Sequence, residues 1–214
     1  MKIAGGYGGL SDFKDGPTHH SICDLAIIRS IPNMTLIVPA DAIETEKAVF
    51  AAAEYEGPVY LRLSRAKVPV IFNENYKMEI GKGNLLKEGK DVTLIATGIM
   101  VARVFEAAEL LENEEKIDAR VIEIHTLKPI DVDIIIQAAE ETGAIVTAEE
   151  HSIIGGLAGT VAEVIAENKP VPMERIGIKD TFTESGEYND LLEKYGLGIS
   201  DIVEAVKKVL KREI

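Results

Sequence analysis

Short apolar runs alternate with a helix-like segment along the first third of the chain. The apolar runs at residues 3–4, 35–38 and 59–63 end at turn residues, and the segment after Asp41 carries apolar residues at helical spacing. This alternation is typical of units in which a helix connects two parallel strands. Such sheets usually contain about four to six strands, so we expect that at least one more strand belongs to this sheet. Asp41 is expected to cap the helix that follows it, and this helix is expected to bury Ile43, Ala48, Val49, Ala52 and Ala53.

The rest of the chain repeats the alternation with longer elements. Strands are predicted at residues 92–96, 119–124, 144–148 and 174–178, with a weaker signal at 82–86, and helices at 100–111, 132–141, 157–167, 189–195 and 200–212. The connecting residues 66–90 are rich in Pro, Gly and Asn, as interdomain connections often are. We therefore predict an α/β protein with one domain at residues 1–78 and a complete α/β domain at residues 79–214.

An acid, a rigid turn and two histidines come together between the first two predicted strands, in the run Asp15-Gly16-Pro17-Thr18-His19-His20-Ser21. Gly16 and Pro17 restrict the backbone, which predicts one stiff turn over residues 15–19. Ser21 is expected to cap a helix over residues 22–31, with the two histidines at its start. A histidine in such a turn can serve chemistry, or it can be only a hydrogen-bonding turn residue.

Composition narrows the possible partners and locations. The 214 residues are 46% hydrophobic, and the net charge of −13 argues against nucleic acid or an anionic membrane as partner. No apolar run approaches the roughly 20 residues that span a bilayer, so we expect a cytoplasmic protein. The single cysteine, Cys23, falls inside a predicted helix and is expected to be a small core residue in a reducing compartment.

Several motifs, in one order along the chain, resemble the second half of the pyrimidine-binding domain of transketolase. They are residues 2–10 (KIAGGYGGL), 15–19 (DGPTH), 30–41 (SIPNMTLIVPAD), 44–49 (ETEKAV) and 62–70 (RLSRAKVPV). Further on, residues 127–131 (LKPID) and 149–157 (EEHSIIGGL) resemble the C-terminal domain of the same family. Deoxyxylulose-phosphate synthase and the β subunit of 2-oxoacid dehydrogenases share this architecture, but the turn at residues 17–19 and the Leu-Ser-Arg segment at 63–65 look more like transketolase.

The resemblance implies a fold and an activity. It implies a truncated thiamine-diphosphate pyrimidine-binding domain followed by a three-layer α/β transketolase C-terminal domain. Transketolases use thiamine diphosphate and Mg²⁺ to move a two-carbon ketol unit from a ketose phosphate to an aldose phosphate in the pentose phosphate pathway, and the protein mainly supplies positioning and proton transfer.

The same resemblance implies roles for four residues. His19 would be catalytic and would contact both the cofactor's thiazolium and the sugar donor, which suits a group that titrates near neutrality. Asp15 would orient a sugar hydroxyl, and Arg65 would hold the sugar phosphate. Tyr7 stands where transketolases usually have a phosphate-contacting histidine, and Lys14 where they usually have an acid. The alternatives are a capping Asp15, a turn His19 and an Arg65 paired at the surface.

The likeness begins partway through the pyrimidine-binding domain. In the family, a glutamate that protonates the cofactor's aminopyrimidine, an aromatic residue that stacks on it, and the diphosphate domain with its Gly-Asp-Gly to Asn magnesium motif precede the point that matches Met1. We find no substitute motif here and expect no metal site. The chain alone is therefore expected to bind no cofactor and to be inactive until a partner chain or an upstream region supplies the missing parts. The alternatives are a non-catalytic interaction module, or a chain shortened at its start.

Three further expectations concern packing. Glycines follow Glu149, Glu150 and His151, and we expect this loop to serve close packing rather than anion binding. His125 is expected to be a loop or interface histidine. A sheet that starts at Lys2 should leave one edge uncovered, so we expect self-association, as a homodimer, through residues 1–78.

Overall fold

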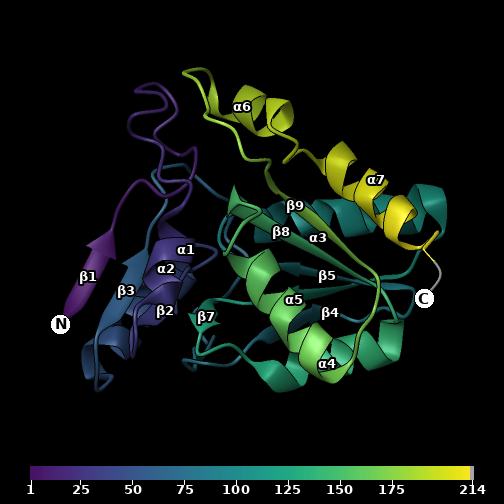
Figure 1. The fold of residues 1–214 in the computed structure, drawn as a ribbon, viewed down its shortest axis with the longest axis horizontal. Helices are drawn as coiled ribbons and strands as arrows, with labels where there is room; N and C mark the ends of the chain where they lie inside the picture. Colours follow the sequence, from purple (N-terminus) through teal and green to yellow (C-terminus); the bar gives the residue numbers. More distant parts are fainter. Residues whose placement is uncertain (213–214) are drawn as a thin grey trace.

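The computed structural model describes residues 1–212, and in these residues the strands form two sheets (Figure 1). The four-stranded sheet has the order β1 (Lys2–Gly5), β3 (Val59–Arg62), β2 (Thr35–Ile37) and β7 (Thr126–Lys128). The five-stranded sheet has the order β4 (Asn84–Lys87), β6 (Ala119–Glu123), β5 (Val92–Ala96), β8 (Ile145–Ser152) and β9 (Met173–Ile178). The central strand pairs of both sheets are parallel, which confirms the predicted α/β class.

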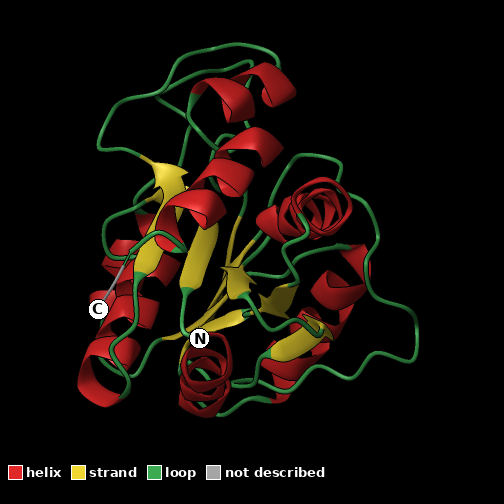
Figure 2. Cartoon of the chain, turned by 90° about the vertical axis from the view of Figure 1, so that its right-hand side faces the viewer, coloured by secondary structure: helices red, strands yellow, loops and turns green. Residues whose placement is uncertain are grey.

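Helices cover both faces of the five-stranded sheet (Figure 2). The helices of the protein are α1 (Asp24–Ser30), α2 (Ala42–Glu54), α3 (Met100–Leu110), which continues as a π-helical turn η1 (Leu111–Glu115), α4 (Val132–Thr142), α5 (Leu157–Asn168), α6 (Tyr188–Lys194) and α7 (Ile199–Val209). Helices α3 and α7 pack on one face and α4 and α5 on the other. None of these helices is both long and apolar enough to cross a membrane.

The strand β5 shows why this sheet is buried on both faces. Val92, Leu94 and Ala96 point into the core formed with α3 and α7, whereas Ile95 points into the core formed with α4 and α5. Side chains alternate between the faces of a strand, so a strand covered on both sides needs apolar residues at successive positions. Burial on both faces therefore explains the near-continuous apolar run by which this strand was predicted.

The four-stranded sheet is built from both halves of the chain. Strand β7, which follows β6, pairs antiparallel with β2 and supplies a strand that the sequence did not predict. Strand β1 lies at the opposite edge, pairs with β3, and alternates between exposed and half-buried residues. The two halves are thus joined by a shared sheet, and the domain boundary near residue 78 stays a prediction.

Three local expectations for the first half are wrong. The first helix begins at Asp24, not after a Ser21 cap, because Ser21 pairs with Gly8 in a β-bridge. Cys23 is consequently the exposed residue before this helix instead of a core residue. In α2, Ala48 and Ala52 are buried, but Val49 is 48% exposed and Ala53 is also exposed, because the helix covers only a narrow stripe of the sheet. The predicted cap Asp41 is confirmed, since its side chain accepts from the Glu44 amide at 2.8 Å.

Candidate functional site

The loop after β1 and the segment after β3 meet at one edge of the four-stranded sheet. The two strands run parallel, so their carboxyl ends lie at the same edge, where open α/β sheets commonly bind ligands. The Gly8 amide donates to the Leu63 carbonyl at 2.9 Å, and the Arg65 amide donates to the Ser11 hydroxyl at 3.1 Å. Tyr7 has a φ of 61°, which non-glycine residues rarely adopt and which is common near functional sites.

The side chain of Arg65 gathers two of the other predicted site residues. Its guanidinium pairs with the buried Asp12, lies 3.4 Å from Asp15 Oδ2, and stands over the Tyr7 ring at 5.4 Å from its centre. The guanidinium stays half exposed. The hydrogen bond and the charge of Asp12 raise the pKa of Arg65. Asp12 was not singled out in the sequence, and nothing in its local motif distinguishes it from an ordinary turn acid.

His19 lies on the same loop but outside this cluster. The turn is as predicted, since Gly16 has a φ of 82° and its carbonyl accepts from the His19 amide at 2.9 Å. The His19 ring is exposed, and its Nδ1 lies 3.1 Å from the Thr18 hydroxyl. The structure therefore brings Tyr7, Asp15 and Arg65 together and leaves His19 open to a ligand that approaches from outside the chain.

The neighbouring His20 anchors this loop to the second half of the protein. Its ring is buried, with Nδ1 2.6 Å from the Thr183 hydroxyl and Nε2 3.2 Å from the Asp12 carbonyl oxygen. Burial lowers the pKa of His20. The loop that carries His19 is thus held in place by a contact that spans the two halves.

A cavity of about 750 Å³ opens beside Arg65. Its lining comes from both halves and includes Phe13, Arg65, Pro69, Arg103, Tyr188 and Leu192. Arg103 is paired with Glu193 at 3.0 Å, so Arg65 is the more exposed of the two arginines that border the cavity. The space is large enough for a small organic molecule, for which pockets of about 300–1,000 Å³ are usual.

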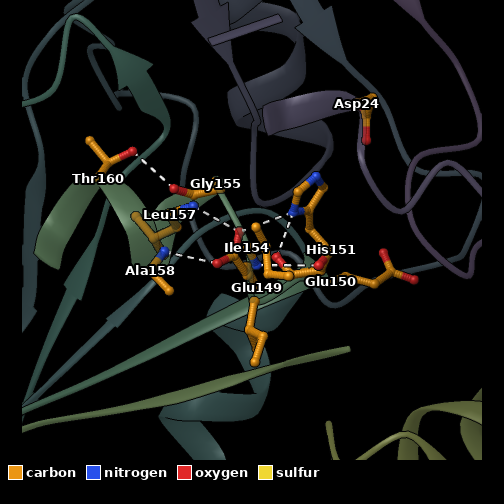
Figure 3. Close-up of polar contacts among 12 residues, drawn as sticks. Asp24, Glu149, Glu150, His151, Ile154, Gly155, Leu157, Ala158 and Thr160 are labelled. Atoms are coloured by element: carbon orange, nitrogen blue, oxygen red, sulfur yellow. Dashed lines mark hydrogen bonds and ion pairs between the residues drawn. The ribbon is translucent and has the colours of Figure 1, made fainter. Parts of the chain in front are cut away.

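The Glu149-Glu150-His151 run forms a buried junction between β8, α5 and the first half (Figure 3). Glu149 accepts hydrogen bonds from the Leu157 and Ala158 amides at 2.7 and 2.8 Å, which satisfies the start of α5. A side chain at Gly156 would overlap the Glu149 carboxylate. The loop therefore serves packing, because a carboxylate of the chain itself fills the helix N-terminus.

The pKa values at this junction reflect burial. Burial raises the pKa of Glu149 and that of Glu150 to about 7, although hydrogen bonds and Arg62 oppose it. Glu150 accepts from the Leu10 amide at 2.8 Å and from the Tyr188 hydroxyl at 3.0 Å. Burial also lowers the pKa of His151 to about 4, so this imidazole is neutral near pH 7.

A buried ion pair completes the junction. Arg62 binds Asp24 through two bonds of 2.8 and 3.1 Å and also donates to the Glu150 carbonyl at 3.2 Å. Burial alone would raise the pKa of Asp24, but the charge and hydrogen bonds of Arg62 outweigh it and lower the pKa. This pair ties β3 and α1 to the end of β8.

Comparison with known families agrees with this architecture. Residues 5–70 match the model of the transketolase pyrimidine binding domain, and residues 81–202 match that of the transketolase C-terminal domain. The chain belongs to the transketolase family. The suspected resemblance is thereby confirmed for most of the chain.

Two relatives within the transketolase family are named as enzyme subunits. The chain is 43% identical to a 6-deoxy-6-sulfo-D-fructose transketolase subunit of Clostridium sp. (strain MSTE9), over 100% of this chain and 66% of the relative. It is 40% identical to one subunit of the apulose-4-phosphate transketolase of Phocaeicola vulgatus, over 99% of this chain and 68% of the relative. The chain thus spans about two thirds of these relatives.

A solved transketolase structure matches the whole fold. It is described as a split gene transketolase in an inactive tetramer, and it is 50% identical with a TM-score of 0.89. The match covers 98% of this chain and 66% of that one. The chain is therefore a partial, C-terminal piece of a transketolase-family protein, as the motifs implied.

Proposed function

We propose that this chain is the C-terminal part of a thiamine-diphosphate-dependent transferase that moves a two-carbon ketol unit from an anionic ketose to an aldose. The observation that carries the proposal is the cluster of Tyr7, Asp15 and Arg65 at the carboxyl edge of the four-stranded sheet, with His19 on the same loop. Thiamine diphosphate would supply the electron sink that lets the carbon–carbon bond break.

Arg65 would grip the anionic end of the sugar. A guanidinium keeps its charge and presents a planar fork of donors that fits phosphate and similar oxyanions. Asp12 and Asp15 pair with the Arg65 guanidinium, while half of the Arg65 side chain stays exposed. The two curated relatives named above act on a sulfo sugar and on a sugar phosphate, according to their names, so a phosphate or a sulfonate suits this residue. The sugar is therefore proposed as an anionic ketose, with the pentose phosphates as one class.

His19 would move a proton at the reacting end of the sugar. An imidazole can both accept and donate a proton. Pro17 and Gly16 fix the turn that presents it, and the buried His20 holds the loop from behind. Asp15 is placed to orient a hydroxyl beside Arg65.

The residues of this chain fit the substrate end of such a site and not its diphosphate end. The Gly-Asp-Gly motif for magnesium is absent from the sequence, and the exposed β1 edge is where the rest of a pyrimidine-binding domain would pair. We therefore propose that another chain or an upstream region supplies the diphosphate-binding domain and the missing first half of the pyrimidine-binding domain. That the relatives are named as subunits supports this division. A cytoplasmic location and a homodimer are part of the same proposal.

The kinetics of two variants test these roles in an enzyme reconstituted with a chain that supplies the diphosphate-binding domain and the first half of the pyrimidine-binding domain. His19→Ala is expected to lower kcat by about 10²-fold or more, whereas Arg65→Ala mainly raises KM for anionic sugars. Lys77→Ala, which removes an exposed cation elsewhere, serves as the control. Unchanged kinetics for both site variants would favour a non-catalytic interaction module.

A further inference from the structure

Two glutamates and a histidine converge at the junction of the two halves, away from the loop that carries His19. Glu44 lies in the first turn of α2, Glu123 ends β6, and His125 follows two residues later. One ligand atom from each residue lies within 4.8 Å of the others. All three residues are buried, with exposures of 0%, 0% and 1%.

The charges of this cluster are not balanced by any cation of the protein. The donors that reach the two carboxylates are neutral: the Tyr76 hydroxyl and the Ala40 amide bind Glu44, and the Asn84 amide binds Glu123. Within residues 1–212, no lysine or arginine acts on either carboxylate, and the neighbouring charge is that of Asp41. Two carboxylates in such a place need either protons or a divalent cation.

One oxygen of the cluster is left without a partner. Glu123 Oε2 accepts from Asn84 at 2.7 Å, whereas Glu123 Oε1 is buried and has no hydrogen-bond partner among the described residues. A buried acceptor without a partner costs about 1–3 kcal/mol, so such atoms are uncommon and point to a bound group.

Each of the three residues is also oriented by a second residue. Tyr76 donates to Glu44 at 2.7 Å, Asn84 to Glu123 at 2.7 Å, and His125 Nδ1 lies 2.8 Å from the Thr126 hydroxyl. The contact at Nδ1 leaves Nε2 as the ring nitrogen for an ion. Metal ligands in proteins are commonly fixed by hydrogen bonds of this kind.

We propose that Glu44, Glu123 and His125 form a structural site for a divalent first-row transition metal, with Zn²⁺ as the probe. Two carboxylates and one imidazole suit such ions, whereas Mg²⁺ prefers oxygen ligands in octahedral geometry. Two zinc bonds of about 2.0–2.2 Å reach ligand atoms up to about 4 Å apart, a span comparable to the 4.8 Å within which all three ligand atoms lie. The site would clamp α2 of the first half to the end of β6, where the Val38 amide already donates to the His125 carbonyl at 2.7 Å. It does not depend on the proposed transferase activity.

Metal content and thermal unfolding of the full chain test the site. After treatment with a chelator and gel filtration with ZnCl₂, the chain is expected to retain one equivalent of zinc. Its Tm is expected to rise by about 5–10 °C when free zinc exceeds Kd by about 100-fold. MgCl₂ at the same concentration is expected to give no such rise.

Three variants make the test specific. Glu123→Gln and His125→Gln should each lose the retained zinc and the rise in Tm, and Thr126→Val should weaken zinc binding by about 10-fold or more. Thr126→Val replaces only the hydroxyl that contacts His125 with a methyl group of similar size. This variant therefore still tests the site if Glu123→Gln and His125→Gln fail to fold. Glu112→Gln, which changes an exposed acid, should bind zinc like the parent. The proposal is overturned if the parent retains no zinc, if Mg²⁺ stabilises it equally, or if Thr126→Val binds zinc as tightly as the parent.

Discussion

The two halves of the chain differ in how completely their sheets are covered. The five-stranded sheet of the second half has helices on both faces, and its central strand β5 is fully buried. The four-stranded sheet, to which the first half supplies three strands, ends in the exposed strand β1, and helix α2, which packs against β3, exposes Val49 and Phe50. The proposed site residues lie in the first half, on loops at this open sheet.

The two halves therefore differ in role, the second contributing stability and the first carrying the proposed site. A sheet with two covered faces buries most of its apolar surface and can fold by itself, whereas an uncovered edge with exposed apolar side chains is suited to pairing with another chain. The junction of Arg62, Asp24 and Glu150 is one of the polar links between the two regions. We infer that the second half is the stable base on which the first half presents the site.

The largest effect on the difference in stability between the two halves is expected from Arg62→Ala. This change leaves the buried Asp24 carboxylate without its partner, which should lower the free energy of unfolding by about 3–5 kcal/mol. Denaturant unfolding measures the loss, and hydrogen exchange should locate it in the first half. Lys194→Ala, in an exposed pair with Glu184, is the control and should change stability by less than about 1 kcal/mol. Equal loss of protection in both halves would argue against an independent second half.

A smaller effect on stability is expected when the pH changes, because of the raised pKa of Glu149. Its pKa is raised from 4.5 to about 7 by burial, so the folded state holds the proton more tightly than the unfolded state. The stability that this group contributes is present below pH 4.5 and is lost as pH rises through about 7. The glutamine in Glu149→Gln does not ionise, so the variant does not lose this stability. Its free energy of unfolding, relative to that of the parent, should therefore rise by up to about 3 kcal/mol between pH 4.5 and about 7. Urea unfolding at several pH values checks the slope, and a difference that does not vary with pH would refute the assignment.

The smallest effect is expected at the open sheet. We predict that the chain self-associates through residues 1–78 and that residues 79–214 alone stay monomeric. Phe50 is 63% exposed on α2, and Phe50→Glu should weaken self-association by about tenfold or more, because it places a charge in an apolar contact. Analytical ultracentrifugation of the parent chain and of Phe50→Glu measures this difference in self-association. A monomeric parent whose first half is well protected in hydrogen exchange would show that the open sheet needs no partner.

Much of the fold follows from local patterns in the sequence. The strands of the second half match their predicted positions because apolar runs buried on both faces leave a strong signal. Strand β7 was missed because three residues carry little pattern, and the strand forms only through its pairing with the distant β2. Ser21 was misread as a helix cap for the same reason, since its bridge to Gly8 overrides the local preference.

The site is predictable in part. The motif resemblance selected Tyr7, Asp15 and Arg65, which the fold brings together, but it could not show that Asp12 holds Arg65. The cluster of Glu44, Glu123 and His125 was also invisible, because its members come from separate elements and follow no metal-binding spacing. Such constellations depend on tertiary packing, which short-range patterns do not encode.

The central claim is that this chain supplies the substrate end of a transketolase site and needs another chain for the cofactor end. Calorimetric titration with thiamine diphosphate and Mg²⁺, together with a ketose-to-aldose transfer assay, tests it on the chain alone and on its mixture with a chain that carries a transketolase diphosphate-binding domain and the first half of the pyrimidine-binding domain. The account predicts neither tight cofactor binding nor transfer by the chain alone, and transfer by a mixture that co-sediments, abolished by His19→Ala. Micromolar cofactor binding or turnover by the chain alone, or a co-sedimenting mixture without transfer, would contradict it.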